Sequence, residues 1–227
     1  MVKRFSIYVR FKFFRLIILN ILETICHMPL QRSLTRQVAK LKQPVHEINP
    51  NSFNTVDQIV FPDEELRIIL NPDQQPQSIL FFDSGPEDPN RMLIFSNNML
   101  IEIAQSATSF QMDGTFSKCP KVYNDGRHNN GQLLTIAARI RGFTLPVFYC
   151  LMKQRTSAAY VQVFRSILQG VNLVPLSFMT DLELAMSRAI SEIFPNCKQT
   201  LCYYHFQESL YSWICSNGLK TRYLNDA

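Results

Sequence analysis

Apolar and polar residues follow regular patterns only after about residue 60. Residues 28–60 hold three prolines among polar residues and show little periodicity, which is typical of a linker. In PDEELRIIL (62–70), a proline and acidic residues stand in the first turn, and this predicts a short helix. The apolar runs SILFF (78–82) and RMLIF (91–95) are separated by the turn-rich DSGPEDPN, which predicts a hairpin or paired strands.

Later segments show either helical or strand-like spacing. SNNMLIEIAQSA (96–107) predicts a helix with Ser96 as N-cap. Three further helices are predicted: one through Tyr160 and Phe164 that Gly170 closes, one from Leu182 to Pro195, and one over 207–218. Five strands are predicted at FQMDGTF (110–116), QLLTIAARI (132–140), LPVFYCLM (145–152), LSFMTD (176–181) and KQTLCYYHF (198–206).

This order of elements predicts the fold class. Three strands, a helix, a strand, a helix, a strand and a helix form an α/β domain of the RNase H-like type, with a mixed sheet flanked by helices. We therefore expect a core over 110–227 and an N-terminal α+β extension over 55–109. Residues 1–54 are expected to be a basic leader and linker that does not pack on the rest.

Charge is concentrated at the N-terminus. The net charge is +5, yet residues 1–42 carry nine Lys or Arg against Glu23 alone, so the remaining residues are faintly acidic. A basic arm attracts nucleic acid or anionic lipid, although a merely solvated leader would have the same composition. Within residues 1–27 the longest uncharged run, Leu16–Leu22, is far shorter than the roughly 20 residues that span a bilayer. A signal anchor or membrane-surface helix stays open, but we expect no membrane partner.

The rest of the composition excludes several classes of protein. With 46% hydrophobic and 18% charged residues, the chain is typical of a globular protein and not of a disordered one. Its six cysteines lack the regular spacing of a disulfide framework, which indicates reduced thiols in an intracellular protein.

Two aspartates are the candidate metal-binding residues. Asp113 lies inside the first predicted core strand, and Asp181 ends the fourth. These strands are neighbours in an RNase H-like sheet, so the two carboxylates can converge on Mg²⁺, which prefers oxygen ligands. Two structural alternatives remain: Thr180 and Glu183 have the spacing of a capping box, and Asp113 beside Gly114 would also suit a bulge or turn.

Several of these stretches together resemble one family. FQMDGTFSKCP, QLLTIAARIRGFTLPVFYCLMKQRTSAAY, FMTDLELAMSRAISEIFP and LCYYHFQESL are similar, in this order, to the transposase domain of Mutator-like elements (MULE). The resemblance covers roughly residues 55–227. It implies a DDE-type transposase of the RNase H-like superfamily, in which Asp113 and Asp181 are catalytic and bind Mg²⁺ or Mn²⁺. It also implies DNA nicking and strand transfer at element ends, in the nucleus.

The chain departs from the family pattern at several points. The connection KCPKVYNDGRHNNGQLL is longer than usual, and Leu182 replaces a phenylalanine. The family uses a third acidic residue after a helical insertion; its position here is unknown, since only Glu208 and Asp226 follow His205. The core is therefore expected to be truncated before that residue, and this chain alone to be inactive. The N-terminal zinc-finger module of many relatives is also absent.

The resemblance also implies roles for three residues near the aspartates. Cys202 and His205 match a Cys-x-x-His of the active-site region, although two residues make only half a zinc site. A core thiol and an imidazole at a helix start are an equal alternative. Glu183 would support the active site or cap a helix.

Two functions remain. The first is a transposase-derived domain with Mg²⁺-dependent strand chemistry, which would take DNA but no small-molecule cofactor and would leave homo-oligomerisation open. The second is a catalytically inactive domesticated remnant that binds DNA or proteins.

Overall fold

The computed structural model describes residues 55–59, 67–68, 77–116, 119–123 and 131–225. The predicted leader and linker, residues 1–54, lie outside these ranges, and so does most of the helix predicted over 62–70. Its two described residues, Arg67–Ile68, instead form strand β1, which pairs antiparallel with β2 (Gln77–Ser78). The helix prediction is wrong there, because pairing with a neighbouring strand prevails over the local helix-start signal.

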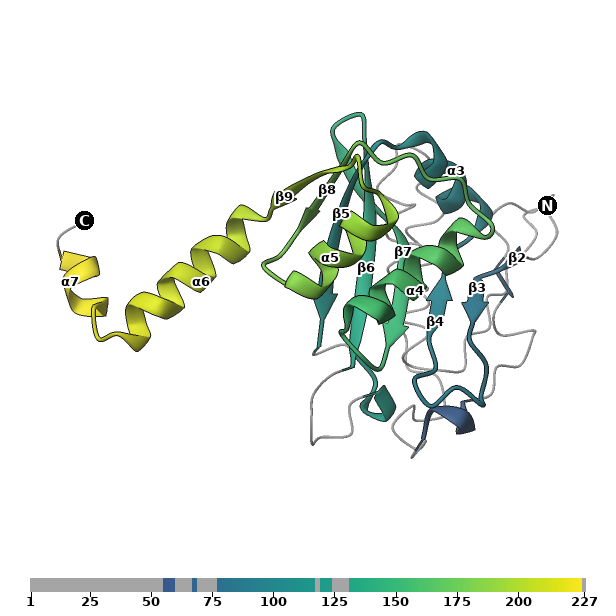
Figure 1. Cartoon of the computed structure of the whole chain (residues 1–227), viewed down its shortest axis with the longest axis horizontal. Coiled ribbons are helices and arrows are strands. Elements are labelled where there is room, and N and C mark those ends of the chain that lie inside the picture. The colour runs from purple at the N-terminus through teal and green to yellow at the C-terminus, as the bar shows by residue number, and fades with distance from the viewer. Residues whose placement is uncertain (1–54, 60–66, 69–76, 117–118, 124–130, 226–227) are drawn as a thin grey trace, which may run out of the picture.

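A seven-stranded mixed sheet forms the centre of the fold (Figure 1). Its strands are β3 (Leu80–Asp83), β4 (Leu93–Phe95), β5 (Ser109–Thr115), β6 (Gln132–Ile140), β7 (Phe143–Met152), β8 (Ser177–Thr180) and β9 (Lys198–Leu201). The order is β3-β4-β7-β6-β5-β8-β9; β8 runs parallel to β5 and β9 parallel to β8, while the other neighbours are antiparallel. This arrangement confirms the predicted RNase H-like α/β fold.

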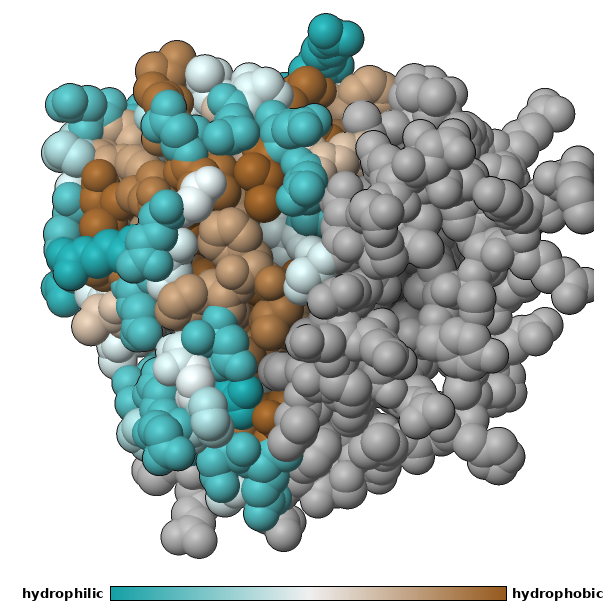
Figure 2. All heavy atoms as spheres, turned by 90° about the vertical axis from the view of Figure 1, so that its right-hand side faces the viewer, coloured by the Kyte–Doolittle hydropathy of each residue, from teal (hydrophilic) through white to brown (hydrophobic). Residues whose placement is uncertain are grey.

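The predicted hairpin is confirmed as β3 and β4. The two strands pair antiparallel, and β4 also pairs with β7, so the hairpin extends the same sheet by two strands. All three residues of β4 are buried, whereas β3 is an edge strand whose residues are half-buried. Figure 2 shows this side of the domain, on which apolar side chains gather between polar ones.

Two helices cover one face of the sheet. Helices α4 (Ser157–Leu168) and α5 (Leu184–Ile193) contact each other and lie across the same face in Figure 1. Beneath them the Phe110 ring stacks on the Phe178 ring, with centroids 5.3 Å apart, and Phe164 of α4 meets Phe178 edge-on at 5.6 Å. Helix α3 (Asn98–Ser106) contacts β6 and β7.

Several helix ends differ from the sequence predictions. The N-cap of α3 is Asn97, whose side chain accepts a hydrogen bond from Leu100 N, while Ser96 Oγ is buried and donates to Val147 O (2.7 Å). The capping box at the start of α5 does not form. Thr180 belongs to β8 and is buried, and its Oγ1 donates to Asp181 O. Glu183 is the N-cap, but its side chain makes no capping hydrogen bond.

The chain turns into helix earlier than predicted after β9. Helix α6 (Tyr203–Ser216) begins directly after the strand and ends near Gly218, whose φ of +70° supports the predicted stop. In Figure 1 it projects away from the sheet and is followed by the short helix α7 (Lys220–Asn225). No residue of α6 is buried among the described residues, and Tyr203, Phe206 and Trp213 are exposed.

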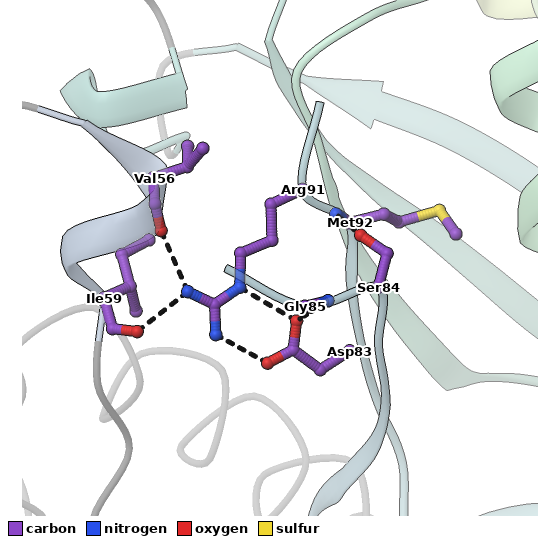
Figure 3. Close-up of polar contacts among 7 residues, drawn as sticks. All are labelled: Val56, Ile59, Asp83, Ser84, Gly85, Arg91 and Met92. Carbon is purple, nitrogen blue, oxygen red and sulfur yellow. Dashed lines mark hydrogen bonds and ion pairs between the residues drawn. The ribbon is translucent and has the colours of Figure 1, made fainter. Parts of the chain in front are cut away.

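A buried arginine ties residues 55–59 to the β3–β4 hairpin (Figure 3). Arg91 Nε and Nη2 donate to the two carboxylate oxygens of Asp83 (2.8 and 2.6 Å). Its Nη1 donates to the backbone oxygens of Val56 (2.9 Å) and Ile59 (2.8 Å). Burial raises the pKa of Asp83, but hydrogen bonds from Arg91 and Gly85 N and the Arg91 charge outweigh it and leave that pKa lowered. The segment around Val56 is therefore part of the folded unit.

Candidate active site

Five strands of the sheet end at one edge, called the carboxyl edge below; β3 is one of them, because β3 and β7 are both antiparallel to β4. Strands β5 and β7 run in the same direction because both are antiparallel to β6, and β8 and β9 run parallel to β5. Their C-terminal ends therefore lie along one edge, which is where open α/β sheets commonly bind ligands. Each candidate residue lies at or just after one of these strand ends.

Asp113 lies near the end of β5 in regular strand geometry. The pairing with β6 continues without a shift from Ser109 to Thr115, with Asp113 opposite Thr135, so the alternative of a bulge at Asp113 is wrong. Phe110 and Met112 are buried on one face of the sheet. Asp113 points to the opposite face, and its side chain is 60% exposed. The carboxylate is thus open to a ligand.

Asp181 follows the neighbouring strand β8. The parallel register pairs Ser109 with Ser177 and Gln111 with Met179, and two further residues along each strand lead to Asp113 and Asp181. Each aspartate therefore lies two residues beyond the last paired residues of these neighbouring strands. That their carboxylates face each other stays a prediction.

The turn after β8 holds Asp181 in place. Its Oδ1 accepts a hydrogen bond from the backbone N–H of Glu183 (3.0 Å), a local Asp turn that occupies one carboxylate oxygen. Glu183 then starts helix α5 as its N-cap. The turn thus couples the position of Asp181 to that of Glu183.

Behind Glu183 lies a buried chain of hydrogen bonds. Tyr160 Oη donates to Glu183 Oε1 (2.8 Å) and accepts from Gln132 Nε2 (2.5 Å), and both Tyr160 and Gln132 are fully buried. Burial raises the pKa of Glu183, and the charge of Asp181 adds to this. The hydrogen bond from Tyr160 and the charge of Arg155 act against the rise without cancelling it. Burial and the Glu183 charge likewise raise the pKa of Tyr160.

Arg155 approaches Glu183 from the loop between β7 and α4. Its Nη1 lies 3.8 Å from Glu183 Oε2, and its guanidinium carbon lies 4.7 Å from the ring centroid of Phe116, the residue after β5. Among the described residues, the buried Nε has no hydrogen-bond partner. This loop thus places a cation beside the Glu183 carboxylate.

The Cys-x-x-His pair lies at the end of β9. Cys202 is the N-cap of α6 without a side-chain hydrogen bond, and its backbone N–H donates to Thr180 O (2.7 Å). His205 lies in the first turn of α6, with Nε2 3.8 Å from Asp113 Oδ1 and a shielded Nδ1 that has no partner in the described part of the chain. The structure therefore brings the His205 side chain next to Asp113 and the Cys202 backbone against Thr180, the residue before Asp181.

The donor set at the carboxyl edge suits a cation that keeps part of its hydration shell. Asp113 and Asp181 offer oxygen ligands, and Mg²⁺ commonly binds through one or two carboxylates plus waters and substrate phosphates. Across the described residues, no group of three or more His, Cys, Asp and Glu side chains forms a metal cage. The residues thus fit a cation shared with substrate.

Sequence reasoning missed the residues that support this edge. Tyr160 was placed on an apolar helix face, and Gln132 and Arg155 had no assigned role. A signal for the first existed, because a buried tyrosine hydroxyl needs a polar partner. Which partner it finds depends on how α4 packs beside the start of α5, and no local pattern shows that.

Comparison with known proteins gives one match. Residues 110–209 match the family model described as the MULE transposase domain. No curated protein and no solved structure matches the chain. In the described residues, no helix has the length and apolar content needed to cross a membrane.

Proposed function

We propose that the carboxyl edge is the catalytic edge of a DNA transposase core, because residues 110–209 match the MULE transposase domain model. Its substrate is DNA, cut and joined at element ends, which implies a nuclear location. Asp113 and Asp181 hold Mg²⁺ or Mn²⁺. The observation that supports the proposal is the parallel register of β5 and β8, whose last pair, Gln111 and Met179, lies two residues before each aspartate.

Each residue of the edge has a distinct role in this proposal. When bound, the metal polarises a phosphodiester and lowers the pKa of the attacking water. Asp113 is open to solvent and supplies carboxylate oxygens from β5. Asp181 keeps Oδ2 for the metal, since its Oδ1 already accepts from Glu183 N. Tyr160 fixes Glu183 and thereby the turn that orients Asp181.

The test compares Asp113→Asn and Asp181→Asn with the parent chain. Calorimetric titration with Mn²⁺ measures metal binding, and nicking of supercoiled plasmid measures chemistry. Metal binding is the primary readout, since the sequence predicts at most weak nicking by this chain. The matched control is Glu192→Gln, because Glu192 is an exposed carboxylate paired with Arg165 (3.1 Å) and lies on α5.

We expect both aspartate variants to lose Mn²⁺ binding and the Glu192 variant to keep it. Any nicking should fall by at least about a hundredfold in either aspartate variant, since metal assistance is worth several kcal/mol. Metal binding without nicking agrees with the expected inactivity of this chain, whereas nicking that depends on both aspartates would exclude the alternative, an inactive DNA- or protein-binding module. Metal binding that survives both substitutions would refute the site.

A further inference from the structure

Arg155, at the carboxyl edge, has a guanidinium with a shielded N–H donor that lacks a hydrogen-bond partner among the described residues. It lies three residues beyond the end of β7, and its side chain is 35% exposed. The guanidinium stacks on the ring of Phe116, which follows the strand that carries Asp113. Its other neighbour is Glu183, two residues after Asp181. Arg155 therefore contacts one residue that follows β5, the strand of Asp113, and one residue that follows Asp181 at the end of β8.

The contacts of Arg155 leave most of its donors unused. Arginine has five N–H donors in a planar fork. The approach to Glu183 is 3.8 Å, which is too long for a hydrogen bond, and Nε has no partner among the described residues although it is shielded from solvent. A buried donor without a partner calls for a ligand or water that completes it. Phe116 covers one face of the guanidinium. The N–H donors lie in the plane of the group and point outward from its edges.

The charges around Arg155 indicate what such a ligand would be. Asp113, Asp181 and Glu183 make the carboxyl edge acidic, and this repels a phosphodiester until cations offset it. Lys153 does not serve, because its Nζ donates to Pro89 O (3.1 Å) at the β3–β4 turn. Arginine binds phosphate through two parallel N–H···O hydrogen bonds, a geometry that lysine cannot form.

We propose that Arg155, stacked on Phe116, is a phosphate-contacting residue that positions a DNA phosphodiester at the carboxyl edge. Its two terminal nitrogens donate N–H groups to two oxygens of one phosphate, while Glu183 and Phe116 hold the guanidinium in orientation. This inference rests on the proposed function only in taking DNA as the substrate. It adds a substrate contact that acts without a metal ion.

The test measures how binding of a fluorescent DNA duplex to the full chain depends on salt. Fluorescence anisotropy gives the dissociation constant over a range of NaCl concentrations for the parent, Arg155→Ala and Arg155→Lys. The matched control is Arg165→Ala, because Arg165 is an exposed arginine on α4 that pairs with Glu192. Thermal unfolding of each variant reports on the fold separately.

We expect Arg155→Ala to weaken DNA binding by about tenfold or more, as for a lost charged hydrogen bond. The slope of log K against log salt should fall in magnitude by about 0.9, the value for one phosphate contact. Arg155→Lys keeps that slope but binds more weakly than the parent, and Arg165→Ala matches the parent. A purely structural role for Arg155 would lower the melting temperature and leave the slope unchanged.

The outcomes separate this inference from the proposed function. If Arg155→Ala and Arg165→Ala bind alike, the phosphate contact is refuted, whatever the aspartate variants do. If Arg155→Ala changes the slope while metal binding survives without the aspartates, the inference stands and the metal site fails. Should Arg155→Ala not fold, a parent-like affinity of Arg155→Lys overturns the bidentate contact. A parent that binds no DNA at low salt refutes both.

Discussion

Replacing Gly114 by alanine should break the hydrogen-bond chain behind the carboxyl edge without touching a charged residue. A Cβ at position 114 would overlap Gln132 Oε1. The Gln132 side chain cannot move aside without an energetic cost, since it is fully buried and its Nε2 donates to Tyr160 Oη. The amide must therefore move, and Tyr160 then loses the partner that orients its bond to Glu183.

The expected cost follows from these contacts. Overpacking a filled core costs about 1–3 kcal/mol. The lost Gln132–Tyr160 hydrogen bond adds about 1 kcal/mol, and the displaced amide costs more if it stays unpaired. Alanine recovers about 0.4–1 kcal/mol by restricting the unfolded chain. We expect a net loss of about 2–3 kcal/mol in the free energy of unfolding.

A double-mutant cycle with Gln132→Ala isolates the clash. Urea unfolding followed by far-ultraviolet circular dichroism gives the free energy of each variant. In the Gln132→Ala background, Gly114→Ala should cost less than about 0.5 kcal/mol, because the obstructing oxygen is gone. Gly170→Ala is the control: its Cβ would meet only the half-buried Phe81 ring at 3.2 Å. An equal cost of Gly114→Ala in both backgrounds would refute the reasoning.

Two further predictions concern the buried Arg91 and its partner Asp83. Arg91→Met should lower the free energy of unfolding by about 3–5 kcal/mol in urea titrations, because it removes the cation that offsets the partly buried Asp83 carboxylate and the donor to two backbone oxygens. Arg165→Ala should cost less than about 1 kcal/mol. Asp83 has a lowered pKa in the folded state, so its contribution is present above about pH 4 and is lost as pH falls through that lowered pKa. Asp83→Asn should therefore flatten the loss of stability below about pH 4, and a parent-like acid profile would contradict this.

The sequence predicted the sheet well because strand signals are local. Each of the five predicted core strands is present, and the hairpin before them is confirmed. Apart from Arg67–Ile68, which form a strand in place of the predicted helix, the errors lie at the boundaries of elements. Ser96 precedes α3, yet its hydroxyl bonds to Val147 on β7, so Asn97 becomes the cap. Thr180 looked like a cap, but it continues β8 into the core. In both cases a contact from a distant strand decided between two locally acceptable roles.

The candidate site divides in the same way. Asp113, Asp181 and the Cys-x-x-His pair were found from the sequence, because each stands at a strand end within a recognisable motif. Arg155, Tyr160 and Gln132 were not, since each carries a residue type that is common in loops, helices and strands.

By itself, then, the sequence determined which segments become strands and helices and which acidic residues end them, because side-chain alternation and turn chemistry act between near neighbours. Only the tertiary structure decided that residues from β6, α4 and the start of α5 meet behind Asp181. It also placed Arg155 over Phe116 and His205 beside Asp113. Such contacts join positions far apart in the chain, and they exist only once parallel strands bring their carboxyl ends to one edge.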